Sequence, residues 1–149
     1  MPDSIRTDIM QNMKSVFLAA TPTGGTLWKR VTYTSNEGFR KKGQNTLELL
    51  EGTEIYVDKI AHNARDRNLD VELSCSAYIP IGTEIRDGAR EVLADMEEVI
   101  VANETWGGLA MGTFFQSNVI DSEDLTDRTV VVSLFMNVQY RTLRSNPRA

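Results

Sequence analysis

The chain has 149 residues, of which 41% are hydrophobic and 25% charged, and its formal net charge is −5. This length and balance are typical of one soluble globular domain spanning residues 1–149, and they exclude a disordered chain. An acidic chain cannot neutralise a phosphate backbone over its whole surface, so the composition also excludes a general nucleic-acid binder.

Cys75 is the only cysteine and His62 the only histidine. These counts exclude an intrachain disulfide and any metal site built from several cysteines or histidines. No segment approaches the roughly eighteen apolar residues of a membrane span, and the N-terminus lacks the basic and apolar regions of a signal peptide. We therefore expect assembly in the cytoplasm, with no membrane partner.

The first half of the chain predicts a helix, a strand and a loop. Residues 4–20 place apolar side chains at helical spacing after Asp3 or Ser4 as the N-cap, and TPTGG ends this helix. Residues 27–34 have the β-branched and aromatic composition of a strand. Residues 35–53 are polar and contain glycine, which predicts an extended loop with at most a helical turn near its end.

A β-hairpin is predicted next, with strands over residues 54–61 and 69–79 and a turn formed by HNARDRN. In the second strand, Cys75 belongs to an apolar row that is expected to face the core. Residues 84–103 then predict the clearest helix, because one apolar stripe recurs at helical spacing. Its opposite face is acidic: seven acids and two bases lie between residues 84 and 104, among them Glu91, Asp95 and Glu98.

The last part of the chain predicts two strands, at residues 113–120 and 129–142, joined by a polar connection and followed by a short tail over residues 143–149. The final strand, TVVVSLFMNVQYRT, is apolar on one face. Its other face is mixed, since Val131 and Phe135 alternate with Ser133, Asn137, Gln139 and Arg141. A half-apolar face on a soluble chain suggests an interface with another protein, with Val131 and Phe135 covered and Arg141 at the rim.

The predicted order is α-β-β-β-α-β-β. Because most strands are adjacent in sequence, it predicts an α+β fold: a mainly antiparallel sheet with two principal helices packed on one face.

The residues supply no catalytic set, and we expect neither enzymatic activity nor a cofactor or metal. A Cys75–His62 pair would have to meet across the hairpin. A small enzyme, if the chain were one, would use Asp70, Glu72 or His62. The glycine-rich stretch Gly107–Gly112 matches neither a dinucleotide-binding nor a phosphate-binding loop.

Charge distribution favours self-assembly instead. Arg40, Lys41 and Lys42 form the densest positive cluster of the chain and lie in the predicted loop. Such a loop on one copy is complementary to the acidic helix face of another, which predicts a heterologous interface between identical subunits.

The arrangement resembles the tail terminator proteins of long-tailed bacteriophages, the lambda-like family. The likeness covers nearly the whole chain: the helix IRTDIMQNMKSVFLAA, the hairpin EIYVDKIAHNARDRNLDVELSCSAYI, the helix AREVLADMEEVIVAN, and the final strand ending in V-x-Y with a short polar tail. It implies a hexameric ring that caps the tail tube, stops its polymerisation and joins it to the head. The implied partners are the tail tube protein and a neck or head-completion protein, with genomic DNA passing through the channel without specific binding.

Three alternatives remain at the level of the sequence. A neck or head-completion connector has a similar length and composition. A small enzyme would require a nucleophile and base that the sequence does not offer, and an adaptor module would bind a partner through a sheet edge.

Overall fold

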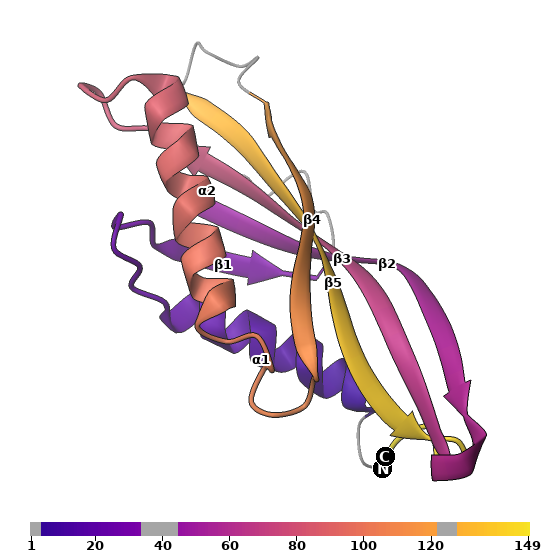
Figure 1. Ribbon diagram of the computed structural model, residues 1–149. Coiled ribbons are helices and arrows are strands. Elements are labelled where there is room, and N and C mark those ends of the chain that lie inside the picture. Colours follow the sequence, from indigo (N-terminus) through magenta and orange to yellow (C-terminus); the bar gives the residue numbers. More distant parts are fainter. Residues whose placement is uncertain (1–3, 34–44, 122–127) are drawn as a thin grey trace.

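The computed structural model describes residues 4–33, 45–121 and 128–149, in which two helices lie on one face of a five-stranded sheet (Figure 1). The elements, in chain order, are α1 (Ile5–Ala19), β1 (Trp28–Thr32), β2 (Asn45–Lys59), the short 3₁₀ turn η2 (Ile60–His62), β3 (Ala64–Tyr78), α2 (Ile85–Val101), β4 (Gly112–Asp121) and β5 (Thr129–Leu143). The predicted element order and the α+β class are confirmed. Neither helix is long and apolar enough to cross a membrane.

The strand order in the sheet is β1-β2-β3-β5-β4. Only the short β1 runs parallel to its neighbour, and the other three pairings are antiparallel. The two central strands, β3 and β5, pair along their full fifteen residues, from Ala64 opposite Leu143 to Tyr78 opposite Thr129. The sheet therefore has a long central ladder with short or partly paired strands at its edges.

The core lies between the sheet and the helices. Along β5, and along β3 from Leu69 onward, every second residue is buried, so that Leu73 and Cys75 face the helices opposite Leu134 and Val132. The rows between them are only partly covered. We call this second side of the sheet, which points away from the helices, the outer face.

Helix α1 begins after Ser4, whose hydroxyl accepts a hydrogen bond from the Thr7 backbone N–H. It buries a stripe that ends in Phe17, which packs edge-on against Trp28 with ring centroids 5.1 Å apart. The Trp106 ring stacks with Phe17, with centroids 6.5 Å apart, and its indole N–H donates a hydrogen bond to the Thr113 hydroxyl. The predicted first helix and its Ser4 cap are confirmed.

Helix α2 approaches the sheet closely at Gly88. A Cβ atom at that position would lie 2.6 Å from the Ile79 side chain, so a side chain larger than hydrogen does not fit. This close approach explains a glycine inside a helix, where it otherwise lowers stability. The close approach also lets the apolar stripe of α2 be buried against the sheet.

Two boundaries predicted from the sequence are wrong. Residues 45–53, assigned to the loop over 35–53, form the first half of β2, because Leu47 and Leu49 alternate into the core opposite β3. The hairpin turn is also shorter than HNARDRN. The chain reverses at Asn63, which adopts the left-handed conformation at φ 48°, and β3 begins at Ala64. Both errors have the same cause: these segments contain polar residues, which favoured a loop or turn, but they form strands with one partly solvated side.

Asp95 differs most from its predicted position on the solvated face of α2, since it is buried. Its two carboxylate oxygens accept hydrogen bonds from the backbone N–H groups of Gly24, at 2.8 Å, and Thr26, at 3.0 Å. These bonds fix the turn that leads from α1 into β1. Asp95 thus serves the fold within the subunit.

We predict that Asp95→Ala lowers the free energy of unfolding by about 2 to 6 kcal/mol, because two backbone N–H groups lose their partner at about 1 to 3 kcal/mol each. Denaturant unfolding measures the change. Glu97→Ala, at a half-exposed site on the same helix, is the control and should change stability by less than about 0.5 kcal/mol. Equal effects of the two substitutions would contradict the role assigned to Asp95.

Candidate assembly surfaces

The outer face of the sheet carries the mixed row predicted for the final strand. Val131, Ser133 and Phe135 lie there, partly exposed, opposite Ser76, Ser74 and Glu72 of β3. Strand β4 adds exposed apolar side chains to the outer face, at residues that were not predicted from the sequence to lie in an interface. Phe114 and Val119 are each 54% exposed and lie beside β5 at the level of Asn137 and Ser133.

Polar side chains on the outer face are linked across three strands. One carboxylate oxygen of Asp70 in β3 accepts hydrogen bonds from the Asn137 amide of β5 and the Gln116 amide of β4, each at 3.2 Å. Gln116 lies at an irregularity in the β4–β5 pairing. Asp70 is therefore engaged with amide groups, and it holds the polar rows of the face in place.

The sheet continues past the helices as a projecting arm, seen at the lower right of Figure 1. We define the arm as residues 54–68 of the β2–β3 hairpin together with residues 139–149. It starts at a bulge between Glu51 and Glu54, where an irregular register increases the strand twist. It carries the exposed apolar side chains of Ile55, Tyr56, Val57, Ile60 and Leu143.

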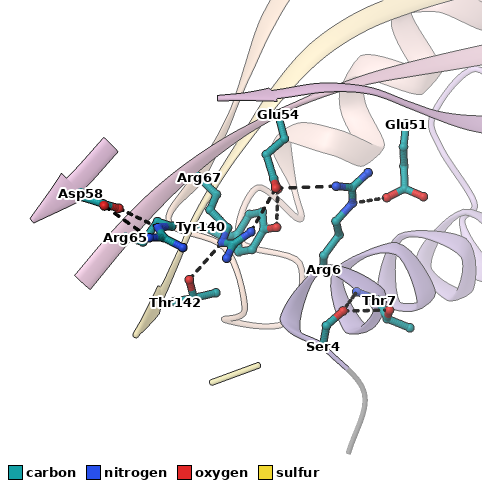
Figure 2. A network of polar contacts seen from close by, with 10 residues as sticks. All are labelled: Ser4, Arg6, Thr7, Glu51, Glu54, Asp58, Arg65, Arg67, Tyr140 and Thr142. Carbon is teal, nitrogen blue, oxygen red and sulfur yellow. Dashed lines mark hydrogen bonds and ion pairs between the residues drawn. The ribbon is translucent and has the colours of Figure 1, made fainter. Parts of the chain in front are cut away.

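A buried carboxylate, Glu54, joins the base of the arm to α1. Its side chain is only 5% exposed and accepts a hydrogen bond from the Tyr140 hydroxyl and one from Arg67, at 3.2 Å (Figure 2). Arg6 of α1 lies 3.6 Å from the same carboxylate and donates to Glu51 at 2.5 Å. Three strands and a helix thus converge on one acid.

The electrostatics of this cluster keep its donors protonated. Burial, followed by the hydrogen bond to Glu54 and its charge, raises the pKa of Tyr140 far above its usual range. Burial alone would lower the pKa of Arg6, but the hydrogen bond to Glu51 and the charges of Glu51 and Glu54 raise it. The cluster is a structural network that joins the arm to α1.

The outer part of the arm is held by ion pairs between neighbouring strands. Arg65 donates to Asp58 and Arg141 to Asp66, each at 2.6 Å. Arg141, expected at the rim of an interface, is therefore exposed and paired within its own subunit. The tail over residues 143–149 folds back onto the hairpin turn, where the Arg144 N–H donates to the Asn63 carbonyl at 3.0 Å.

The acidic face of α2 forms a second charged surface. Glu91 is exposed, whereas Glu98 accepts hydrogen bonds from the backbone N–H and the hydroxyl of Thr23, at 2.8 and 2.6 Å. Those two bonds lower the pKa of Glu98. The basic cluster Arg40, Lys41 and Lys42, expected to meet this face, lies outside the described residues.

The residues considered for catalysis lie far apart. Cys75 is in the core, where burial raises the pKa of its thiol to about 12, and His62 is exposed at the tip of the arm. Eleven residues of β3 separate Cys75 from the turn, or about 35 Å at 3.3 Å per residue, so the two do not form a pair. Within the described ranges no three His, Cys, Asp or Glu side chains are grouped to hold a metal ion.

The fold can be compared with those of known proteins. A chain from a solved structure, "Virion of native gene transfer agent (GTA) particle", superposes with a TM-score of 0.51 at 13% sequence identity. The alignment covers 93% of this chain and 96% of that one. The two chains share a fold. No protein-family model and no curated protein sequence matches this chain.

The Glu54 cluster yields a stability prediction. Glu54→Ala should lower the free energy of unfolding by about 3 kcal/mol, because it leaves Arg67 and Tyr140 buried without their acceptor. Hydrogen exchange should show the loss first in the arm. Glu51→Ala removes a one-third exposed partner of Arg6 and is the matched control, with an expected change of at most about 1 kcal/mol. A larger effect at Glu51 than at Glu54 would refute this assignment.

Proposed function

We propose that this protein is a structural virion protein, a tail terminator that forms a hexameric ring, caps the tail tube and provides the surface for head joining. The observation that carries the proposal is the fold shared with a chain of a virion particle over 93% of this chain. The element order, which resembles the tail terminator family, supports the finer assignment. No step of this role requires catalysis.

The surfaces of the subunit suit a ring. A closed ring of identical copies needs two different complementary patches on each copy. The acidic face of α2 and the projecting arm lie on separate parts of the molecule, and Val131 and Phe135 lie on the side of the sheet away from the helices. The proposed partners are further copies of the chain, the tail tube protein and a neck or head-completion protein. DNA would pass the predominantly acidic ring without specific binding, since phosphates are repelled by carboxylates.

A neck or head-completion connector is the second candidate, because a fold shared with a chain of a virion particle fits a connector as well as a tail terminator. Imaging distinguishes the two by position. Antibody labelling of intact particles should find the protein where the tail meets the head and in contact with the tube, whereas a connector would remain with heads that lack tails.

Deleting the gene for this protein from the genome of its virus-like particle should give tails of irregular and excessive length. These tails should not join heads, because nothing would stop polymerisation of the tube. Electron microscopy of lysates measures tail length, and supplying the chain in trans is the control. Tails of normal length without the protein would reject the tail terminator assignment.

Phe135→Asp tests the outer face. The substitution should leave the monomer folded, because Phe135 is already partly exposed, and it should weaken ring formation by placing a charge in an apolar contact. Circular dichroism and sedimentation velocity separate the two effects. Phe135→Leu should retain the ring, and Leu134→Asp, on the buried row of the same strand, should unfold the subunit. A Phe135→Asp variant that still forms rings would exclude this face from the interface.

A further inference from the structure

The described part of the molecule has opposite charges at opposite ends. The arm carries six basic and three acidic side chains and is therefore net +3, on a chain whose formal net charge is −5. Residues 84–104, comprising α2 and its flanks, are net −5. The two regions lie at different ends of the sheet in Figure 1. One copy of the chain is therefore electrostatically complementary to another placed head to tail.

The arm also exposes apolar side chains that nothing in its own described subunit covers. Ile60 at the tip is 75% exposed and Ile55 on the outer face is 60% exposed. Phosphate binding gains little from such residues, and the arginines Arg65, Arg67, Arg141 and Arg144 already pair with acids of the arm. A cationic surface with an isoleucine at its tip is therefore better suited to bind an apolar hollow on an acidic protein surface than to bind DNA.

Such a hollow exists between the ends of the two helices. It has a volume of about 470 Å³ and lies where the last turn of α1 meets the second half of α2. Its lining is mainly apolar, with Glu98 at its edge, and the apolar residues are Val16, Ala19, Ala20, Pro22, Val99 and Ala102. The arm points away from the helices in Figure 1. Ile60 lies in the η2 turn at the end of the arm, whereas the hollow is lined by the last turns of α1 and α2, so the two are apart within one copy.

We infer that the arm of one copy docks across α2 of a second copy, with Ile60 seated in the hollow between α1 and α2 and with Lys59 facing the acidic side chains of α2. Arm and hollow are different surfaces, so each copy can both give an arm and receive one. This contact would be one of the interfaces of the proposed ring. That such contacts close into a ring rests on the proposed function. The cationic partner of α2 in this contact is the arm, whose residues the sequence predicted as a strand over 54–61, a turn over 62–68, the end of the final strand and the tail over 143–149.

The contact has a kinetic signature. Opposite net charges on the two surfaces should speed association at low ionic strength and lose this advantage as salt screens them. Apolar burial at Ile60 should persist at high salt. Association that strengthens with salt would therefore point to an apolar contact without the charge pairing inferred here.

The decisive experiment combines two disabled variants. The arm variant, Ile60→Glu with Lys59→Glu, lacks a functional arm, and the hollow variant, Ala102→Arg, fills the receiving site. Each alone should self-associate at least roughly 30-fold more weakly than the wild type, as expected when a hot-spot contact is lost. Mixed together they retain one intact arm and one intact hollow, so sedimentation velocity should show a 1:1 heterodimer that grows no further. Self-association by either variant at wild-type strength, or a mixture without heterodimer, would overturn the inference.

A cross-linking measurement covers the case of a weak contact. Ile60→Cys and Ala102→Cys chains, mixed at high concentration and oxidised, should form a disulfide between the two variants. The natural Cys75 should not interfere, because it is fully buried and the pKa of its thiol is raised to about 12. Ile81→Cys, at another exposed isoleucine outside the arm, is the matched control and should not cross-link to Ala102→Cys. Failure of the Ile60–Ala102 disulfide, or equal yield with Ile81, rejects the contact.

The two proposals can fail separately. A heterodimer from the mixed variants together with normal tail length in the deletion would keep the arm contact and reject the tail terminator role. Overlong tails together with no heterodimer would keep that role and reject the arm contact.

Discussion

The organisation of this subunit follows from a mismatch of lengths. Strands β2, β3 and β5 each have fifteen residues and so reach about 50 Å, whereas α1 and α2, with fifteen and seventeen residues, reach only about 25 Å. Two such helices cannot cover the whole sheet. Where they lie over it, apolar rows form a continuous core. Beyond them the same strands need other interactions to stay together, and Glu54 with its arginine and tyrosine partners supplies these at the boundary.

Acidic residues consequently have two different uses in one short chain. Asp95 and Glu54 are buried and bind donors of other elements, so they determine how α2, α1 and the arm are joined. Glu91, by contrast, remains exposed on α2. The charge composition of the sequence does not distinguish the buried structural acids from the exposed ones. Only the contacts show which carboxylates define the fold and which are available to a partner.

The sequence predicted the elements but not their lengths or their cross-connections. Alternation of apolar residues identified β5 almost residue for residue, because a strand buried on one side has a period of two. It failed for residues 45–53, where the burial of Leu47 and Leu49 depends on pairing with β3, a distant partner. The burial of Asp95 could have been foreseen, since it lies beside Val92, Met96 and Val99 on the apolar stripe of α2. The Glu54 cluster could not, because its four residues come from positions 6 to 140 of the chain.

The arm also makes the subunit sensitive to acid. Hydrogen bonds from Arg65 and Arg141 lower the pKa values of Asp58 and Asp66, so these carboxylates stabilise the folded arm above their unfolded pKa of about 4. This stabilisation is lost as the pH falls through their lowered folded values. The buried rows of β3 and β5 beneath the helices hold no carboxylate. Acidification should therefore loosen the arm, together with the Thr23–Glu98 contact at α2, while these apolar rows stay packed.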